Sequence, residues 1–127
     1  MKANNTDTAL LLVRIALGLV FLAHGATKFM DMPGTLQFFT AMHLSALWAY
    51  LVATIETLGG LAMLLGIATG WAGILLAVVM LGSTFLVKMS HGFIGGYEFD
   101  LTLFLSAIAI SLAGPGKYTL RFALKGQ

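Results

Sequence analysis

The sequence predicts an all-α integral membrane protein, a four-helix bundle with both termini in the cytoplasm. Three observations predict this fold: 59% of the 127 residues are hydrophobic, only 9% are charged, and the apolar residues gather in four long runs. Soluble domains carry about 25% charged residues, so this chain lacks the polar surface that water requires. The fifteen glycines suit membrane helices, where small residues let backbones approach closely.

The four apolar runs give four predicted spans, because a helix needs about 20 residues to cross about 30 Å of hydrocarbon. Asp7 or Thr8 is expected to cap the first helix, and Ser45 to cap the second. The fourth is short, and the segment GPGKY ends it. Since no soluble domain fits beside the spans, residues 1–127 are predicted to form a single domain. The expected helices cover residues 8–29, 45–67, 70–89 and 99–113.

The connections between these spans differ in kind. Residues 30–44 form the longest, in which DMPG indicates a turn and LQFFTAMHL indicates a short amphipathic helix at the membrane interface. Thr69 and Gly70 are expected to make a tight hairpin between the second and third spans. Residues 90–98 are predicted to form a glycine-rich loop with aromatic anchors.

Basic residues set the predicted orientation, since cytoplasmic flanks are enriched in lysine and arginine. An even number of spans places both termini on one side of the membrane. Lys28 and Lys88 lie near the opposite face. The termini carry the larger share of the basic residues, which favours a cytoplasmic location for Lys2, Lys117, Arg121 and Lys125.

Composition and motifs exclude several classes of function. A net charge of +2 without a basic cluster argues against nucleic-acid binding. The absence of cysteine excludes disulfides, thiol catalysis and iron–sulfur ligation by this chain. His24 and His91 show no HxxxH or His/Cys spacing, so no metal site is predicted. Neither a nucleophile triad nor a phosphate-binding loop is found, and catalytic residues stay unassigned. Residues 1–8 are polar and precede a run longer than a signal peptide's apolar core, so we expect the N-terminus to be retained.

Three ionisable residues fall inside the predicted spans, where a charged group costs about 2.5–3.5 kcal/mol. Arg14 shares a helical stripe with Gly18 and Gly25, which implies a close neighbouring helix. Counting about 1.5 Å per residue places Arg14 and Glu56 at similar depth. One interpretation is a structural ion pair, Arg14–Glu56, between the first two helices. The other is that Glu56 binds or protonates a ligand within the bundle.

A second polar group gathers at the outer end of the bundle. His24 and Lys28 end the first span, and the third span and the loop after it bring further polar residues to the same face. Polar side chains at the mouth of an apolar bundle suit an amphipathic ligand with a polar head, such as a quinone. Simple snorkelling of lysines and solvation of loop charges is the alternative. The predicted ligand-binding residues are His24, Lys28, Glu56 and His91, and the other polar residues at this end are Lys88, Glu98 and Asp100.

Three segments together resemble the DoxX family of small four-helix membrane proteins. The first helix carries RIALGLVFLAHGATKF, from Arg14 to Phe29; the second carries ETLGGLAMLLG, from Glu56 to Gly66; and the end carries GPGKYTL, from Gly114 to Leu120. The resemblance implies a bacterial inner-membrane protein with four helices. It also implies a relation to thiosulfate:quinone oxidoreductase subunits, which share this kind of bundle.

Two functional hypotheses follow, with a third ranked below them. The first is a quinone-linked redox component or subunit of a membrane oxidoreductase complex. No cofactor is certain from the sequence and quinone is the candidate, with electrons supplied by a membrane or periplasmic partner or a soluble reductant. The second is a non-catalytic accessory or scaffold subunit, so the sequence leaves open whether the protein is an enzyme. The third is a small transporter, which would require a homo-oligomer because four short helices enclose little space.

Overall fold

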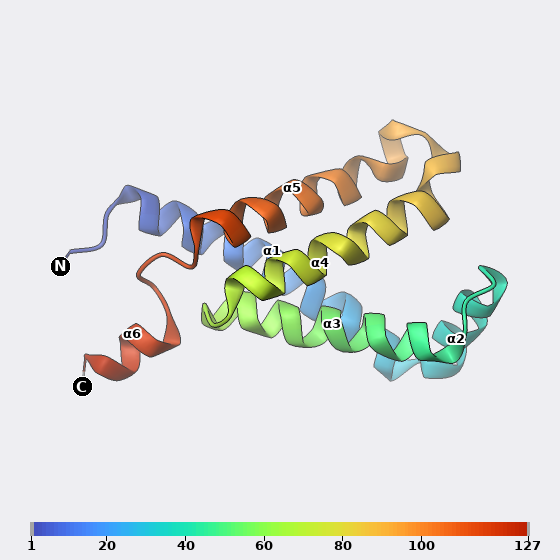
Figure 1. The fold of residues 1–127 in the computed structure, drawn as a ribbon, viewed down its shortest axis with the longest axis horizontal. Coiled ribbons are helices and arrows are strands. Elements are labelled where there is room, and N and C mark those ends of the chain that lie inside the picture. Colours follow the sequence, from blue (N-terminus) through green and yellow to red (C-terminus); the bar gives the residue numbers. More distant parts are fainter. Residues whose placement is uncertain (1, 127) are drawn as a thin grey trace.

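The computed structural model describes residues 2–126, which form helices and connecting turns without any strand. Within this range four helical segments are long and apolar enough to cross a membrane: Asn5–Met30, Ala46–Leu65, Thr69–His91 and Phe93–Ala113. The predicted all-α fold with four spans is thereby confirmed. Both ends of the described chain lie at the same end of the bundle (Figure 1), as an even number of spans requires.

The helices follow one another in a simple order (Figure 1). The α-helices are α1 (Asn5–Met30), α2 (Met32–Ala41), α3 (Ala46–Leu65), α4 (Thr69–Ser83), α5 (Glu98–Ala113) and α6 (Leu120–Lys125). Three short helices of other types connect α4 to α5: η1 (Thr84–Lys88), η2 (Met89–His91) and η3 (Phe93–Tyr97). The segment η1 is a π-helix that continues α4. The segment η3 is kinked, with non-helical backbone at Ile94, Gly95 and Gly96, and leads into α5 at the start of the short fourth span.

The start of α1 differs from its prediction. Asn4 is the capping residue: its side chain accepts from the backbone N of Asp7 at 2.9 Å, while the Asp7 carboxylate accepts from the backbone N of Asn4 at 3.0 Å. This reciprocal arrangement is a capping box. Asp7 and Thr8 therefore lie inside the helix, and the predicted cap was wrong because the polar segment before the apolar run is itself helical.

Two connections also differ from their predictions. Asp31 caps α2 by accepting from the backbone N of Gly34 at 3.1 Å, so DMPG begins the helix instead of forming a separate turn. A proline in the first turn is compatible with this, since its missing N–H would be unpaired there anyway. The hairpin between α3 and α4 uses Gly66 and Ala68, which both have positive φ, and α4 already begins at Thr69.

Glycines bring the helices together in two pairs. A Cβ on Gly60 of α3 would lie 2.5 Å from the backbone N of Leu22 in α1, and a Cβ on Gly73 of α4 would lie 2.6 Å from the carbonyl of Ala107 in α5. Such distances are far shorter than any real carbon contact, so only glycine permits these helices to approach so closely. The bundle therefore consists of one pair, α1 with α3, and a second pair, α4 with α5.

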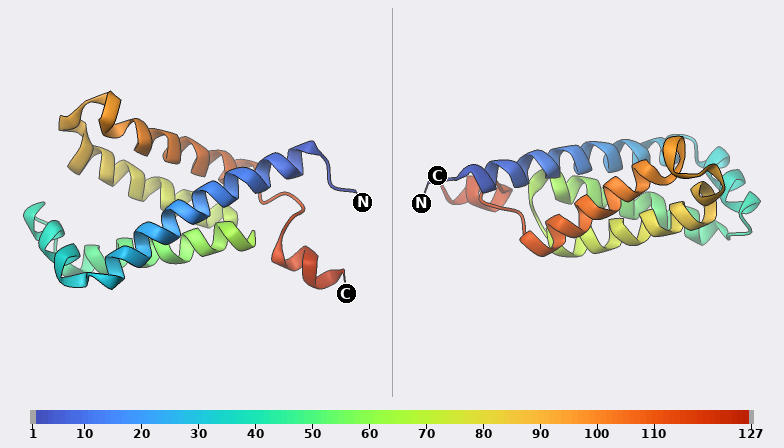
Figure 2. Two further views of the ribbon diagram at one scale, coloured as in Figure 1. Left: turned by 180° about the vertical axis from the view of Figure 1, so that it is seen from behind. Right: turned by 90° about the horizontal axis from the view of Figure 1, so that it is seen from above.

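The two helix pairs diverge along the bundle. They lie close together at the end that holds the termini and separate toward the end that carries α2 (Figures 1 and 2). A cluster of buried side chains joins the pairs in the middle and at the terminal end, and includes Leu17, Phe21, Met63, Leu76 and Ile110. The end that carries α2 lacks such a cluster among the described residues, and the candidate site lies there.

Candidate functional site

The predicted ion pair between Arg14 and Glu56 is not formed. Arg14 is fully buried, and its guanidinium donates four hydrogen bonds to backbone carbonyls. Nε donates to Met63 O at 2.9 Å, and Nη2 to Leu64 O at 3.2 Å. Nη1 donates to Pro115 O and Tyr118 O, both at 2.7 Å. Arg14 therefore joins the C-terminal end of α3 to the segment that follows α5.

The axial alignment of α1 and α3 explains why the predicted pair fails. Gly18 lies against Gly60 and Leu64, which places Arg14 beside the last turn of α3, about two turns from Glu56. The sequence estimate assumed that both helices fill the same slab, whereas α1 has 26 residues and α3 has 20. The carbonyls at the C-terminus of α3 carry partial negative charge, so they stabilise the guanidinium without a carboxylate.

Glu56 pairs instead with Lys28. The Lys28 Nζ donates to Glu56 Oε2 at 2.6 Å, and the glutamate side chain is only 4% exposed, against 26% for the lysine. His24 lies four residues before Lys28, so both project from the same face of α1. The closing residues of the first span therefore bring a cation to the buried carboxylate of α3.

A second pair joins α4 and α5 at the same end. The Lys88 Nζ donates to Asp100 Oδ1 at 3.3 Å, and Asp100 is 2% exposed. Lys88 ends the π-helix η1, a type of distortion that is frequent at functional sites because the extra residue changes which face the following side chains take. The other carboxylate oxygen of Asp100, Oδ2, is buried and has no hydrogen-bond partner among the described residues.

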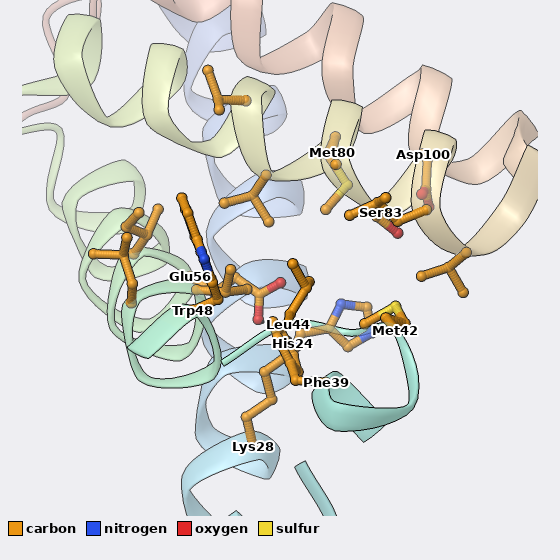
Figure 3. Close-up of a pocket in the computed structure, with 18 of the residues that line it drawn as sticks. His24, Lys28, Phe39, Met42, Leu44, Trp48, Glu56, Met80, Ser83 and Asp100 are labelled. Atoms are coloured by element: carbon orange, nitrogen blue, oxygen red, sulfur yellow. Dashed lines mark hydrogen bonds and ion pairs between the residues drawn. The ribbon is translucent and has the colours of Figure 1, made fainter. Parts of the chain in front are cut away.

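Both ion pairs line one cavity of about 630 Å³ between the diverging helix pairs. Lys28, Glu56 and Asp100 are seen around it in Figure 3. Its size falls within the range of about 300–1,000 Å³ that is typical of ligand pockets. The walls are mainly apolar, with contributions from α2 and from the residues that follow it. The polar and charged residues that line the cavity are His24, Lys28, Glu56, Ser83, Lys88 and Asp100.

The structure unites three of the four predicted ligand-binding residues. His24, Lys28 and Glu56 line the cavity, and the His24 ring meets Phe99 edge-on at 6.3 Å between centroids. His91 is not among the lining residues of this cavity. It is exposed, and its Nδ1 lies 3.1 Å from Val87 O. The loop geometry of residues 89–91, a 3₁₀ turn after the π-helix, directs His91 away from the site.

Sequence reasoning placed Lys88 and Asp100 at this end but did not include them in the site. A signal was present, because each pair of spans has a lysine at the end of its first helix and an acidic residue in its second. The contribution of α2 was also missed. Phe39, Met42 and Leu44 line the cavity, and His43, whose φ of 60° makes the chain turn sharply, lies between the last two. A left-handed residue of this kind is not visible in the hydrophobic pattern.

Comparison with known proteins identifies relatives across most of the chain. A model of the DoxX family matches residues 9–89. A Bacillus subtilis protein named "Putative oxidoreductase CatD" is 39% identical over 118 residues, covering 92% of this chain and 88% of the relative. A Mycobacterium tuberculosis protein named "Uncharacterized membrane protein Rv3486" is 32% identical over 124 residues, covering 85% of this chain and 76% of the relative. No solved structure matches the chain with significance.

The family match includes the two helical segments, Arg14–Phe29 and Glu56–Gly66, in which the sequence resembles the DoxX family. The family match ends at residue 89, where the π-helix η1 has just brought Lys88 to the cavity, and the Bacillus subtilis relative extends the similarity over nearly the whole chain. The spans described above and the membrane-protein relative agree that the chain crosses the bilayer several times. This multi-pass membrane protein belongs to the DoxX family.

Proposed function

We propose that this protein is a quinone-linked redox component of the bacterial inner membrane, and that a quinone head group binds in the cavity between the helix pairs. One observation carries the proposal: a buried carboxylate–lysine pair, Glu56–Lys28, lies on the wall of a largely apolar cavity of about 630 Å³. The printed name of the Bacillus subtilis relative, which includes the word oxidoreductase, supports a redox role.

The side chains around the cavity fit a quinone. Its ring carbonyls are hydrogen-bond acceptors, and Lys28 and His24 supply donors, since a lysine has three and Glu56 uses one of those of Lys28. The apolar residues of α3 and α4, among them Val52, Ile55 and Val79, suit the ring and the first part of an apolar tail. Leu51 and Val78 also line the cavity and are about half exposed, so they would contact the tail where it leaves the cavity toward lipid.

The proposed reaction uses the quinone as an acceptor of two electrons and two protons, which gives the hydroquinone. This chain contributes the proton-bearing groups, with Lys28 and His24 near the ligand and Glu56 holding the lysine in place. The electrons come from a membrane or periplasmic partner protein or from a soluble reductant. In the proposed orientation the termini are cytoplasmic, and the cavity lies near the outer face of the membrane.

Quinone content and binding test the proposal. The protein is purified in native lipid, its quinone is extracted and quantified, and added quinone is titrated by quenching of Trp48, which lines the cavity. A Trp71→Phe background removes the second tryptophan of the sequence. We expect bound quinone in the wild type and at least about tenfold weaker binding in His24→Ala, equal to about 1.4 kcal/mol.

His91→Ala is the matched control, because this histidine lies at the same end of the bundle but outside the cavity. It is expected to bind quinone as the wild type does. Wild-type protein that holds no quinone in native lipid, and in which added quinone leaves the Trp48 emission unchanged, would refute the proposed function. Equal losses in His24→Ala and His91→Ala would place any quinone site elsewhere.

A further inference from the structure

Each helix pair carries its own lysine–carboxylate pair. In the first, Lys28 of α1 contacts Glu56 of α3 at 2.6 Å; in the second, Lys88 of η1 contacts Asp100 of α5 at 3.3 Å. In both cases the lysine ends the first helix of the pair and the acidic residue lies on the second. Neither ion pair crosses from one helix pair to the other, so each holds its own pair together. Within residues 2–126 no ion pair links the two helix pairs at this end.

The two ion pairs nevertheless line the same cavity. Figure 3 shows Lys28 and Glu56 on one side of it and Asp100 on another. Phe99 connects the two sides, since its ring lies 6.3 Å from the His24 ring and 5.7 Å from the Lys88 Nζ. Hydrogen-bonding groups of both helix pairs therefore border the same space, and a ligand in the cavity is offered donors and acceptors from both pairs.

The second side is incomplete as the structure stands. Asp100 Oδ2 is buried and receives no hydrogen bond from the part of the chain that the structure describes, although Asp100 is one of the residues that line the cavity. A buried polar atom without a partner costs about 1–3 kcal/mol, so a donor brought by a ligand would recover that energy. A carbonyl cannot donate, whereas a hydroxyl can. The acidic side chain of the second helix pair therefore selects for a hydroxyl group.

We infer that the cavity takes a ring ligand with two oxygens on opposite sides, one held by each helix pair, and that the oxygen beside Asp100 is a hydroxyl. This inference rests on the proposed function and sharpens it, because it identifies the 1,4-hydroquinone as the preferred form of the ligand. Lys28 and Glu56 hold one oxygen, and Lys88 and Asp100 hold the other. The ligand is then the polar link between the two helix pairs at the open end.

Paired ligands and paired variants test this inference. A short-tailed 1,4-hydroquinone and the matched phenol, which lacks one ring hydroxyl, are titrated anaerobically by calorimetry into protein in lipid nanodiscs. The wild type is expected to bind the hydroquinone at least about tenfold more tightly than the phenol. In Lys28→Met/Glu56→Leu and in Lys88→Met/Asp100→Leu, each of which removes the hydrogen-bonding groups of one side, that preference is expected to fall to about equal binding.

A control and a substitute variant keep the test decisive. Asp7→Asn/Lys117→Met neutralises an ion pair at the opposite end of the bundle, whose atoms are 3.8 Å apart, and is expected to keep the tenfold preference. Thermal unfolding shows whether each variant is folded. Should Lys88→Met/Asp100→Leu fail to fold, the nearly isosteric Lys88→Met/Asp100→Asn takes its place. Because an amide accepts a weaker hydrogen bond from a hydroxyl than a carboxylate does, the preference is then expected to fall several-fold.

The oxidised form of the ligand, a 1,4-quinone, gives a second test of the same inference. A 1,4-quinone with the same tail has no hydroxyl, so the wild type is expected to bind it several-fold more weakly than the hydroquinone. Asp100→Asn, whose amide can donate to a carbonyl, is expected to remove that difference. Wild-type protein that binds quinone but does not distinguish hydroquinone from phenol would overturn the two-sided site and leave the proposed function standing. Failure to bind any of the three compounds would overturn both.

Discussion

The two ends of the bundle stabilise their charged side chains in different ways. At the terminal end, Arg14 is completely buried and donates to four carbonyls from two segments of the chain. At the end that carries α2, Lys28 and Lys88 each contact a single carboxylate and also line a cavity. The terminal end therefore encloses its arginine completely, whereas the end that carries α2 leaves its two lysines next to a cavity.

The difference shows that an ionisable residue in a membrane span is not by itself a sign of a ligand site. A buried charge is costly in hydrocarbon and must find partners. A guanidinium has five N–H donors in a fixed plane, and Arg14 uses four hydrogen bonds to satisfy it. The lysines of the open end retain unused donors, and Asp100 retains an unused acceptor. Spare hydrogen-bonding capacity, more than charge, distinguishes the candidate site.

Replacing Arg14 is expected to have the largest effect on stability and so gives the strongest test of the difference between the two ends. Arg14→Met removes the donor of four carbonyls, so the free energy of unfolding is expected to fall by about 4 kcal/mol. Unfolding in mixed detergent micelles measures it. Lys125→Met, which removes an exposed cation near the same end, is the control and should change stability little. An Arg14→Met protein as stable as the wild type would show that the guanidinium does not hold the closed end together.

The contact between α1 and α3 gives the next largest effect. In Gly60→Ala the new Cβ would lie 2.5 Å from a backbone atom of α1, so the helices must separate, at an expected cost of about 2–3 kcal/mol. Gly82→Ala is the matched control, because Gly82 is also helical but has no atom within 4 Å of the added carbon. Its stability in the same unfolding assay should equal or exceed that of the wild type, since alanine favours helix.

The turn after α3 separates backbone strain from the role of Arg14. Gly66 has a φ of 69°, and an added Cβ would lie 2.5 Å from Arg14 Nη2. Gly66→Ala is expected to cost about 1–2 kcal/mol, because alanine is strained there and displaces the guanidinium. The cost should be smaller in an Arg14→Met background, where the second effect is absent. Equal costs in both backgrounds would mean that strain alone is responsible. Gly70→Ala, in ordinary helix, serves as the control.

The smallest effect on stability is expected at the open end. Lys88→Met/Asp100→Asn removes both charges of a pair together, and such replacements are often close to neutral because the cost of desolvating the charges is removed too. The free energy of unfolding should change by less than about 1 kcal/mol, while ligand binding changes as described above. A loss as large as that of Arg14→Met would mean that the two ends do not differ in the way proposed.

The sequence was sufficient for the spans and for part of the site. Hydrophobic run length located all four membrane helices, and the direction of the first span brought His24 and Lys28 to the same end of the bundle, because both depend only on local geometry. The partner of Arg14 could not be found in this way. It depends on how far α1 is displaced along α3, which is set by the contact of Gly18 with Gly60 and Leu64. The carbonyls that it binds leave no trace in side-chain identity.

The long reach of Arg14 has a consequence for how the protein is made. Two of its hydrogen bonds join residues 101 and 104 positions apart in the chain. The first helix must therefore enter the bilayer with its guanidinium still lacking these acceptors, and it stays so until residues 115–118 have been synthesised. Completion of the bundle thus waits for the synthesis of residues 115–118, and a nascent chain halted before Pro115 would hold an arginine that lacks two of its four hydrogen bonds.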